Sequence, residues 1–287
     1  MTRVKSVERV LNGLPTMDGA GVRIYRAIGN TDLKLTDPFL LLDDIHSSNP
    51  EDYMAGFPLH PHRGIETVTY MISGVMNHQD SIGNKGRIAS GDVQWMTAGS
   101  GILHQETPER WDGFMQGFQL WVNLPRKSKM MDPRYRGIMS DEIPTLRPAE
   151  GIEIRLVAGR MNDAEGPVRD LVQPIEFLDV ALGPGKRFDH MVDASWNCFA
   201  YVFHGDGDFG ADDAVAVEEG QVAVFGKGDE IEGIAGNKGM RFILAGGKPL
   251  QEPVAWGGPV VMNTQDEVDL AFRELRSGTF VKVKPKH

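Results

Sequence analysis

Five of the eight histidines fall within one third of the chain, at His46, His60, His62, His78 and His104. Two pairs of donors there have a single residue between them, His60-Pro61-His62 and His104-Gln105-Glu106. In an extended chain, residues i and i+2 project from the same face, so each pair would aim two donors into one cavity. Imidazole nitrogens and carboxylate oxygens bind first-row transition metals. The spacing therefore predicts a metal site.

Strands are the elements that would have to position these donors. Short apolar or alternating runs such as GVRIYRAI, PFLLLDDI, IETVTYMISG and MQGFQLWVNL recur along the chain, separated by Gly, Asp, Asn and Pro. Such runs, rich in β-branched and aromatic residues, indicate an all-β sandwich or barrel. Neighbouring antiparallel strands in one barrel would bring the two donor pairs together.

A second carboxylate leaves the ligand set open, because Glu66 could be the fourth ligand in place of Glu106. Glu66 shares the parity of His60 and His62, so an unbroken strand would point all three side chains inward. A bulge at Gly64 would change the facing of Glu66. It would then be an ordinary buried carboxylate, satisfied by Arg63 or by backbone amides. Both interpretations fit the sequence.

The order of elements repeats along the chain. The first half contains ISG followed by GDVQWMTAGSG, and the second half contains FHG followed by GQVAVFGKGD. This repeated order predicts two tandem β-barrels. We place an N-terminal barrel with the metal site at 1–135 and a second barrel at 136–287. The second half has Phe188-Asp189-His190 in place of His60-Pro61-His62, and IEGIAG in place of ILHQE. We therefore expect it to lack a metal site.

One helix is predicted near the C-terminal end of the chain, in NTQDEVDLAFRELRSG. Thr264 and Glu267 have the spacing of a capping box, and Gly278 is a plausible stop. Its apolar face would comprise Val268, Ala271, Phe272 and Leu275. We expect this helix to have a packing role and to contribute no catalytic or metal-binding residue.

Composition excludes several classes of function. The 287 residues include 34 Gly and 17 Pro and carry a formal charge of −10, which argues against direct binding to nucleic acid. The single cysteine, Cys198, allows no intrachain disulfide, and its apolar neighbours predict a buried thiol. No stretch approaches the ~20 apolar residues of a membrane span. We expect a cytoplasmic protein, or a nuclear one in a eukaryote.

The histidine region resembles the cupin family and, more closely, the pirins. Gly56-x3-His60-x-His62-x3-Glu66-x7-Gly74 is similar to the first cupin motif, and Gly91-x7-Gly99-x4-His104 to the second. The runs FPLHPHRGIETVTY, GDVQWMTAGSGILHQE, GFQLWVNLP and PVVMNT are similar to pirins. The resemblance implies a bicupin, two double-stranded β-helix barrels with a C-terminal helix.

The resemblance also implies a ligand set and a reaction. One mononuclear metal, usually Fe(II) but alternatively Mn, Ni, Cu, Co or Zn, would be held by His60, His62, His104 and Glu106, with Glu66 left out. The implied reaction is cleavage of quercetin-type flavonols by O2 with release of CO, in which Glu106, or alternatively Glu66, accepts a proton. Near the ligands, the candidate pocket walls are Phe57, Trp95, Met96 and Phe118. One alternative is a non-enzymatic, iron-binding regulatory protein that acts through protein partners. Another is a different cupin reaction, such as isomerisation or metal-assisted hydrolysis, with Zn or Mn on the same ligands.

Overall fold

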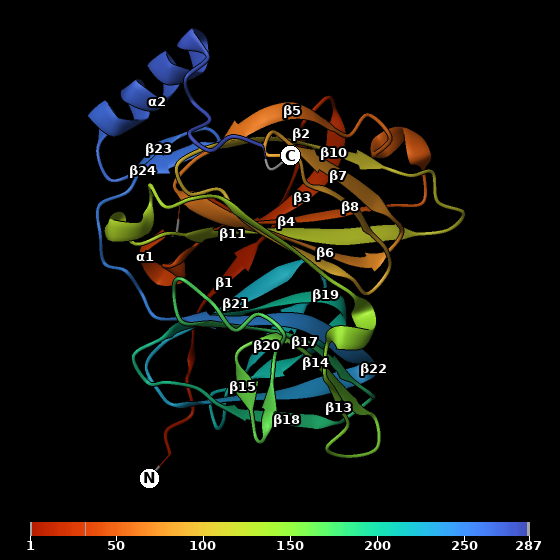
Figure 1. The fold of residues 1–287 in the computed structure, drawn as a ribbon. Coiled ribbons are helices and arrows are strands. Elements are labelled where there is room, and N and C mark those ends of the chain that lie inside the picture. Colours follow the sequence, from red (N-terminus) through yellow and green to blue (C-terminus); the bar gives the residue numbers. More distant parts are fainter. Residues whose placement is uncertain (1, 32, 286–287) are drawn as a thin grey trace. The chain divides into compact units, whose positions relative to one another are not determined.

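The computed structural model describes residues 2–31 and 33–285 and is dominated by β-strands (Figure 1). The chain folds into two compact units. The histidine unit comprises Pro15–Arg26, Phe39–Ser140 and Leu250–His287. The companion unit comprises Met1–Leu14, Ala27–Pro38 and Asp141–Pro249.

Two main sheets build the histidine unit. The smaller sheet has the order β5-β10-β7-β8, formed by β5 (Phe57–His62), β10 (Ile102–Pro108), β7 (Met76–Asp80) and β8 (Lys85–Ile88). The larger sheet has the order β12-β9-β6-β11-β4-β3-β2, formed by β12 (Arg134–Ile138), β9 (Val93–Thr97), β6 (Ile65–Ser73), β11 (Met115–Asn123), β4 (Phe39–Ser47), β3 (Val22–Ile28) and β2 (Leu14–Asp18). The short helices η1 (Pro50–Asp52), η2 (Arg126–Ser128) and η3 (Ser140–Glu142) lie in connections.

The two sheets of the histidine unit face each other. Thr69 on β6 and Gln119 on β11 both donate hydrogen bonds to Glu106 on β10, across the space between the sheets. Apolar side chains fill part of that space, including Met71, Met76 and Met115. The predicted all-β bicupin fold is confirmed, but the strands form open, facing sheets in a jelly-roll arrangement and not a closed barrel.

One large sheet forms most of the companion unit. Its main order is β1-β21-β19-β22-β17-β14-β13, and β18 and β20 pair with β22 and β19. The strands are β1 (Val7–Asn12), β13 (Thr145–Leu146), β14 (Ile152–Ala158), β17 (Ile175–Leu182), β18 (Arg187–Met191), β19 (Asn197–Phe209), β20 (Val215–Glu218), β21 (Gln221–Phe225) and β22 (Glu230–Gly247). A small hairpin, β15 (Arg160–Met161) with β16 (Ala164–Glu165), and the short helix α1 (Leu33–Thr36) complete it. Cys198 is buried as predicted, and burial raises the pKa of its thiol to about 12.

The two ends of the chain belong to the unit built by the opposite half of the sequence. Strand β1 pairs with β21 of the companion unit, with Val10 opposite Ala223. Residues from Leu250 onward belong to the histidine unit. The division of the domains at 135/136 stays a prediction. In the structure, three segments belong to the unit built mainly by the other half of the chain: Met1–Leu14, Ala27–Pro38 and Leu250–His287.

The C-terminal segment supplies the hairpin β23 (Ala255–Gly257) and β24 (Val260–Met262), followed by α2 (Gln265–Ser277). The predicted helix is confirmed, with a capping box between Thr264 and Glu267 and a left-handed Gly278. Val268 and Ala271 are buried, as the predicted apolar face requires. Within the described residues, neither helix has the length and apolar character needed to cross a membrane.

Lys129 links the C-terminal segment, which begins at Leu250, to the turn between β5 and β6. Its ammonium is buried and donates to Gly64 O at 2.9 Å, Val261 O at 2.8 Å and Asn123 Oδ1 at 2.6 Å. Burial lowers the pKa of Lys129 to about 8, so the group remains largely charged at neutral pH. One side chain therefore connects this turn, β11 and β24.

We expect Lys129→Met to lower the free energy of unfolding by about 2–4 kcal/mol, because buried acceptors lose their donor. Urea denaturation would measure the loss. Lys127→Met is the matched control, since Lys127 is exposed and two residues away. Equal stability of the two variants would contradict the role assigned to Lys129.

Candidate metal centre

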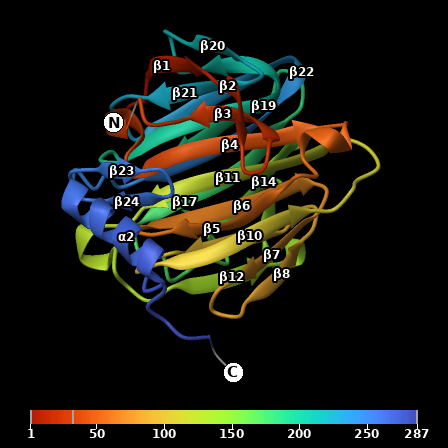
Figure 2. The same ribbon diagram turned by 90° about the horizontal axis from the view of Figure 1, so that it is seen from above.

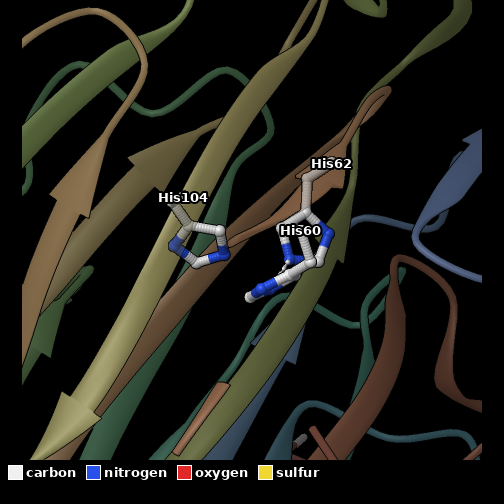
Figure 3. A group of neighbouring side chains, drawn as sticks. All are labelled: His60, His62 and His104. Atoms are coloured by element: carbon white, nitrogen blue, oxygen red, sulfur yellow. Dashed lines mark hydrogen bonds between the residues drawn. The ribbon is translucent and has the colours of Figure 1, made fainter. Parts of the chain in front are cut away.

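Three imidazoles converge in the histidine unit, as the sequence predicts (Figure 3). His60 and His62 come from β5 and His104 from β10, which lie side by side with His104 opposite His60 (Figure 2). The ring centroid of His104 is 4.3 Å from that of His60 and 4.9 Å from that of His62. One ligand nitrogen from each ring lies within 4.8 Å of the others. This is a group that could hold a metal ion.

Each ring has a partner at its Nδ1 atom. His60 Nδ1 is 2.8 Å from Pro58 O, His62 Nδ1 is 3.3 Å from Pro259 O, and His104 Nδ1 is 3.3 Å from His78 Nδ1. A carbonyl only accepts, so the first two rings carry their proton on Nδ1 and a lone pair on Nε2 when neutral. The Nδ1 contacts thus direct the lone pairs toward the shared space.

The Nε2 atoms fit a metal ion. Those of His60 and His62 are 3.1 Å apart, and two lone pairs at that distance repel unless a cation or a proton lies between them. His104 Nε2 is buried without a hydrogen-bond partner. A metal would satisfy all three nitrogens.

Burial also keeps two of the rings in the neutral form that binds metals. Desolvation, followed by the neighbouring imidazoles, lowers the pKa of His62 and of His104 well below the usual histidine value. A neutral ring needs no proton release before it coordinates a cation.

Glu106 lies on the same face of β10 as His104 and is buried. Its Oε1 accepts from Thr69 Oγ1 at 3.0 Å and its Oε2 from Gln119 Nε2 at 2.8 Å. Among the described residues, the group whose ligand atoms lie within 4.8 Å of one another comprises the three histidines without Glu106. Its part as a fourth ligand stays a prediction.

Glu66 is separated from the histidines by a turn. Gly64 has a φ of +79°, and a Cβ there would lie 2.0 Å from Val261 O, so the position requires glycine. After this turn the chain enters β6 in the other sheet, where Glu66 Oε1 accepts from Thr97 Oγ1 at 2.5 Å. Burial raises the pKa of Glu66. The unbroken strand that would group it with His60 and His62 does not form.

A cavity of about 500 Å³ opens beside His60 and His62. The other lining residues are Asp18, Gly19, Ile24, Arg26, Leu41, Asp43, Ile45, Phe57, Pro58, Gln119, Trp121, Trp256, Gly258 and Pro259. Phe57 lines the cavity as predicted, whereas Trp95, Met96 and Phe118 are buried and do not line it. No sequence pattern points to Trp256, because it is far along the chain from the histidines.

The cavity has an aromatic part and a charged part. The rings of Trp121 and Trp256 stack with centroids 6.0 Å apart. Arg26 donates to both carboxylate oxygens of Asp43 at 2.8 Å. A flat, partly polar molecule matches such a lining.

Histidines of the companion unit are arranged differently. His190 Nε2 is 3.0 Å from Glu176 Oε2 in a buried pair, and the side chain of His204 is 73% exposed. The expectation that this half lacks a metal stays a prediction.

Comparison with known proteins gives matches over most of the chain. Residues 21–122 match the family model described as Pirin, and residues 177–281 match that of the Pirin C-terminal cupin domain. A Pseudomonas aeruginosa protein provisionally named a quercetin 2,3-dioxygenase is 40% identical over 282 residues, 97% of this chain and 99% of the relative. Rat pirin is 40% identical over 266 residues, 91% of this chain and 88% of the relative.

A solved structure is similar over almost the whole length. The crystal structure of quercetin 2,3-dioxygenase from Acinetobacter baumannii has a TM-score of 0.90 and 32% sequence identity. The match covers 97% of this chain and 99% of that chain.

Proposed function

The chain belongs to the pirin family, and from that premise we propose that it is a metal-dependent dioxygenase that cleaves quercetin-type flavonols with O2. The observation that carries the proposal is the convergence of three Nε2 atoms beside an aromatic-lined cavity. The similarity to a solved quercetin 2,3-dioxygenase supports the same reaction class.

His60, His62 and His104 would hold one divalent metal, with Glu106 as the fourth ligand. Fe(II) is our first choice, with Mn, Ni, Cu, Co and Zn as alternatives that suit the same donors. When bound, such an ion lowers the pKa of a nearby hydroxyl group and orients the reactants. In the overall reaction both atoms of O2 enter the depside product, and one carbon leaves as CO.

The chain's own residues would bind and orient the flavonol. The stacked rings of Trp121 and Trp256 offer an apolar face to a flat ring system. Glu106, held by Thr69 and Gln119, would accept the proton of the 3-hydroxyl group. Its two hydrogen bonds fix the carboxylate in one orientation.

Incubation of the Fe(II)-loaded protein with quercetin under ¹⁸O2 tests the proposal. We expect the flavonol absorbance to fall, CO to form, and the depside to carry both labelled atoms. Protein stripped of metal by a chelator should be inactive and recover when Fe(II) is restored. Elemental analysis after expression without added metal would identify the resident ion.

Bound metal without turnover of any flavonol would overturn the dioxygenase proposal. That result would favour the regulatory alternative, in which the metal centre serves binding to a protein partner. Partners captured by the ferrous but not by the ferric protein would then be the next measurement.

A further inference from the structure

A fourth histidine lies directly behind the metal centre. His78 on β7 is buried, and its ring centroid is 5.2 Å from that of His104. Its Nδ1 is 3.3 Å from His104 Nδ1, and its Nε2 is 3.4 Å from Asp80 Oδ2. His78 and Asp80 have the same i, i+2 spacing as the other two donor pairs, yet neither has a part in the reaction proposed above.

We propose that His78 and Asp80 are positioning residues of the metal centre. Asp80 orients the ring of His78, and His78 accepts the Nδ1 proton of His104, so that His104 presents Nε2 to the metal. The inference rests on the proposed metal centre but not on the flavonol reaction.

The direction of this chain of hydrogen bonds follows from counting protons. A neutral imidazole carries one proton, so a ring that binds metal through Nε2 holds it on Nδ1. His78 Nδ1 must then provide a lone pair, which places the proton of a neutral His78 on Nε2, directed at Asp80. A carboxylate behind a metal-bound histidine fixes the tautomer and raises the basicity of the ligand.

Asp80 is itself held firmly. Its Oδ1 accepts from the backbone amides of Ile82 and Asn84 at 3.0 and 2.9 Å, and its Oδ2 accepts from Asn84 Nδ2 at 2.7 Å. Burial raises the pKa of Asp80, but hydrogen bonds from His78 and Asn84 outweigh it and leave the pKa below its usual value. The turn after β7 thus supplies a charged acceptor in a fixed place.

Tyr135 holds the ring of His78 by stacking on it. The two centroids are 4.9 Å apart with an interplanar angle of 30°. Gly86 is opposite His78 on β8, and a Cβ there would lie 1.8 Å from Tyr135 Oη. The absence of a side chain at Gly86 therefore makes room for Tyr135.

His104 differs from the other two ligands in its Nδ1 partner. His60 and His62 face backbone carbonyls, whereas His104 faces a side chain. The orientation of His104 can therefore be altered by mutation without a change in the backbone.

Titration with Co(II) under chelator competition tests the inference. We expect His78→Leu to weaken Co(II) binding by about 10–100-fold and to shift the visible spectrum of the bound ion. His78→Asn should recover part of the affinity, since its Oδ1 takes the place of Nδ1 as an acceptor. Asp80→Asn keeps the shape of the side chain and should weaken Co(II) binding less than His78→Leu does. It also serves as the test if His78→Leu does not fold.

His190→Leu is the matched control, because it removes a buried imidazole paired with a carboxylate in the companion unit. It should lower the melting temperature and leave Co(II) binding unchanged. Wild-type affinity and spectrum in both folded His78→Leu and Asp80→Asn would overturn the positioning role. A wild-type protein that binds no Co(II) would overturn the metal centre as well, whereas a failure to cleave flavonols would count only against the proposed reaction.

Discussion

Replacing His62 by alanine is expected to abolish both metal binding and flavonol turnover. The substitution removes one of three converging Nε2 atoms, and the ligands that remain are too few to hold a divalent ion tightly. We expect metal affinity to fall more than about a hundredfold, beyond what loss of a supporting residue causes. Metal content after dialysis and the rate of quercetin loss would measure the two effects.

His204→Ala is the matched control for this substitution. The side chain of His204 is 73% exposed and belongs to the companion unit, so neither metal content nor rate should change. A His62→Ala protein that keeps its iron would contradict the ligand set, and one that keeps its rate would contradict the site of reaction.

Glu106→Gln is expected to lower the turnover number by about 10²–10⁴-fold, the usual contribution of a general base. Glutamine has nearly the same shape and can still accept from Thr69, but it cannot take the proton of the flavonol. Steady-state kinetics with metal-saturated protein would give the loss. Glu109→Gln is the control, since Glu109 is partly exposed and paired with Arg87.

The metal affinity of Glu106→Gln separates two roles of the carboxylate. A fall in affinity identifies Glu106 as a fourth ligand. Unchanged affinity with reduced turnover assigns it to proton transfer alone. Full activity in the variant would contradict both.

The histidine group was predictable because strand geometry is local. Residues two apart share a face, and His104 needed only to pair with the strand that carries His60. The facing of Glu66 was ambiguous for the same reason, because the rule that residues two apart share a face holds only within an unbroken strand. The turn at Gly64 depends on the close approach of Val261, and that contact joins segments far apart in sequence.

The cavity and the exchanged ends could not be predicted, because they also depend on contacts between segments far apart in sequence. Trp256 and Pro259 reach the site from the C-terminal segment, and a local pattern carries no information about such contacts. The i, i+2 spacing of His78 and Asp80 is visible in the sequence. Its relation to His104 becomes clear only from the pairing of β7 with β10.

The exchange of the chain ends has a consequence for biosynthesis. Pro259, whose carbonyl oxygen fixes the tautomer of His62, and Trp256, which lines the cavity, are translated well after the strands that carry the three histidines. A nascent chain that has already made both β5 and β10 therefore still lacks part of the surroundings of the three histidines. The site is complete only after the segment from Leu250 onward has left the ribosome.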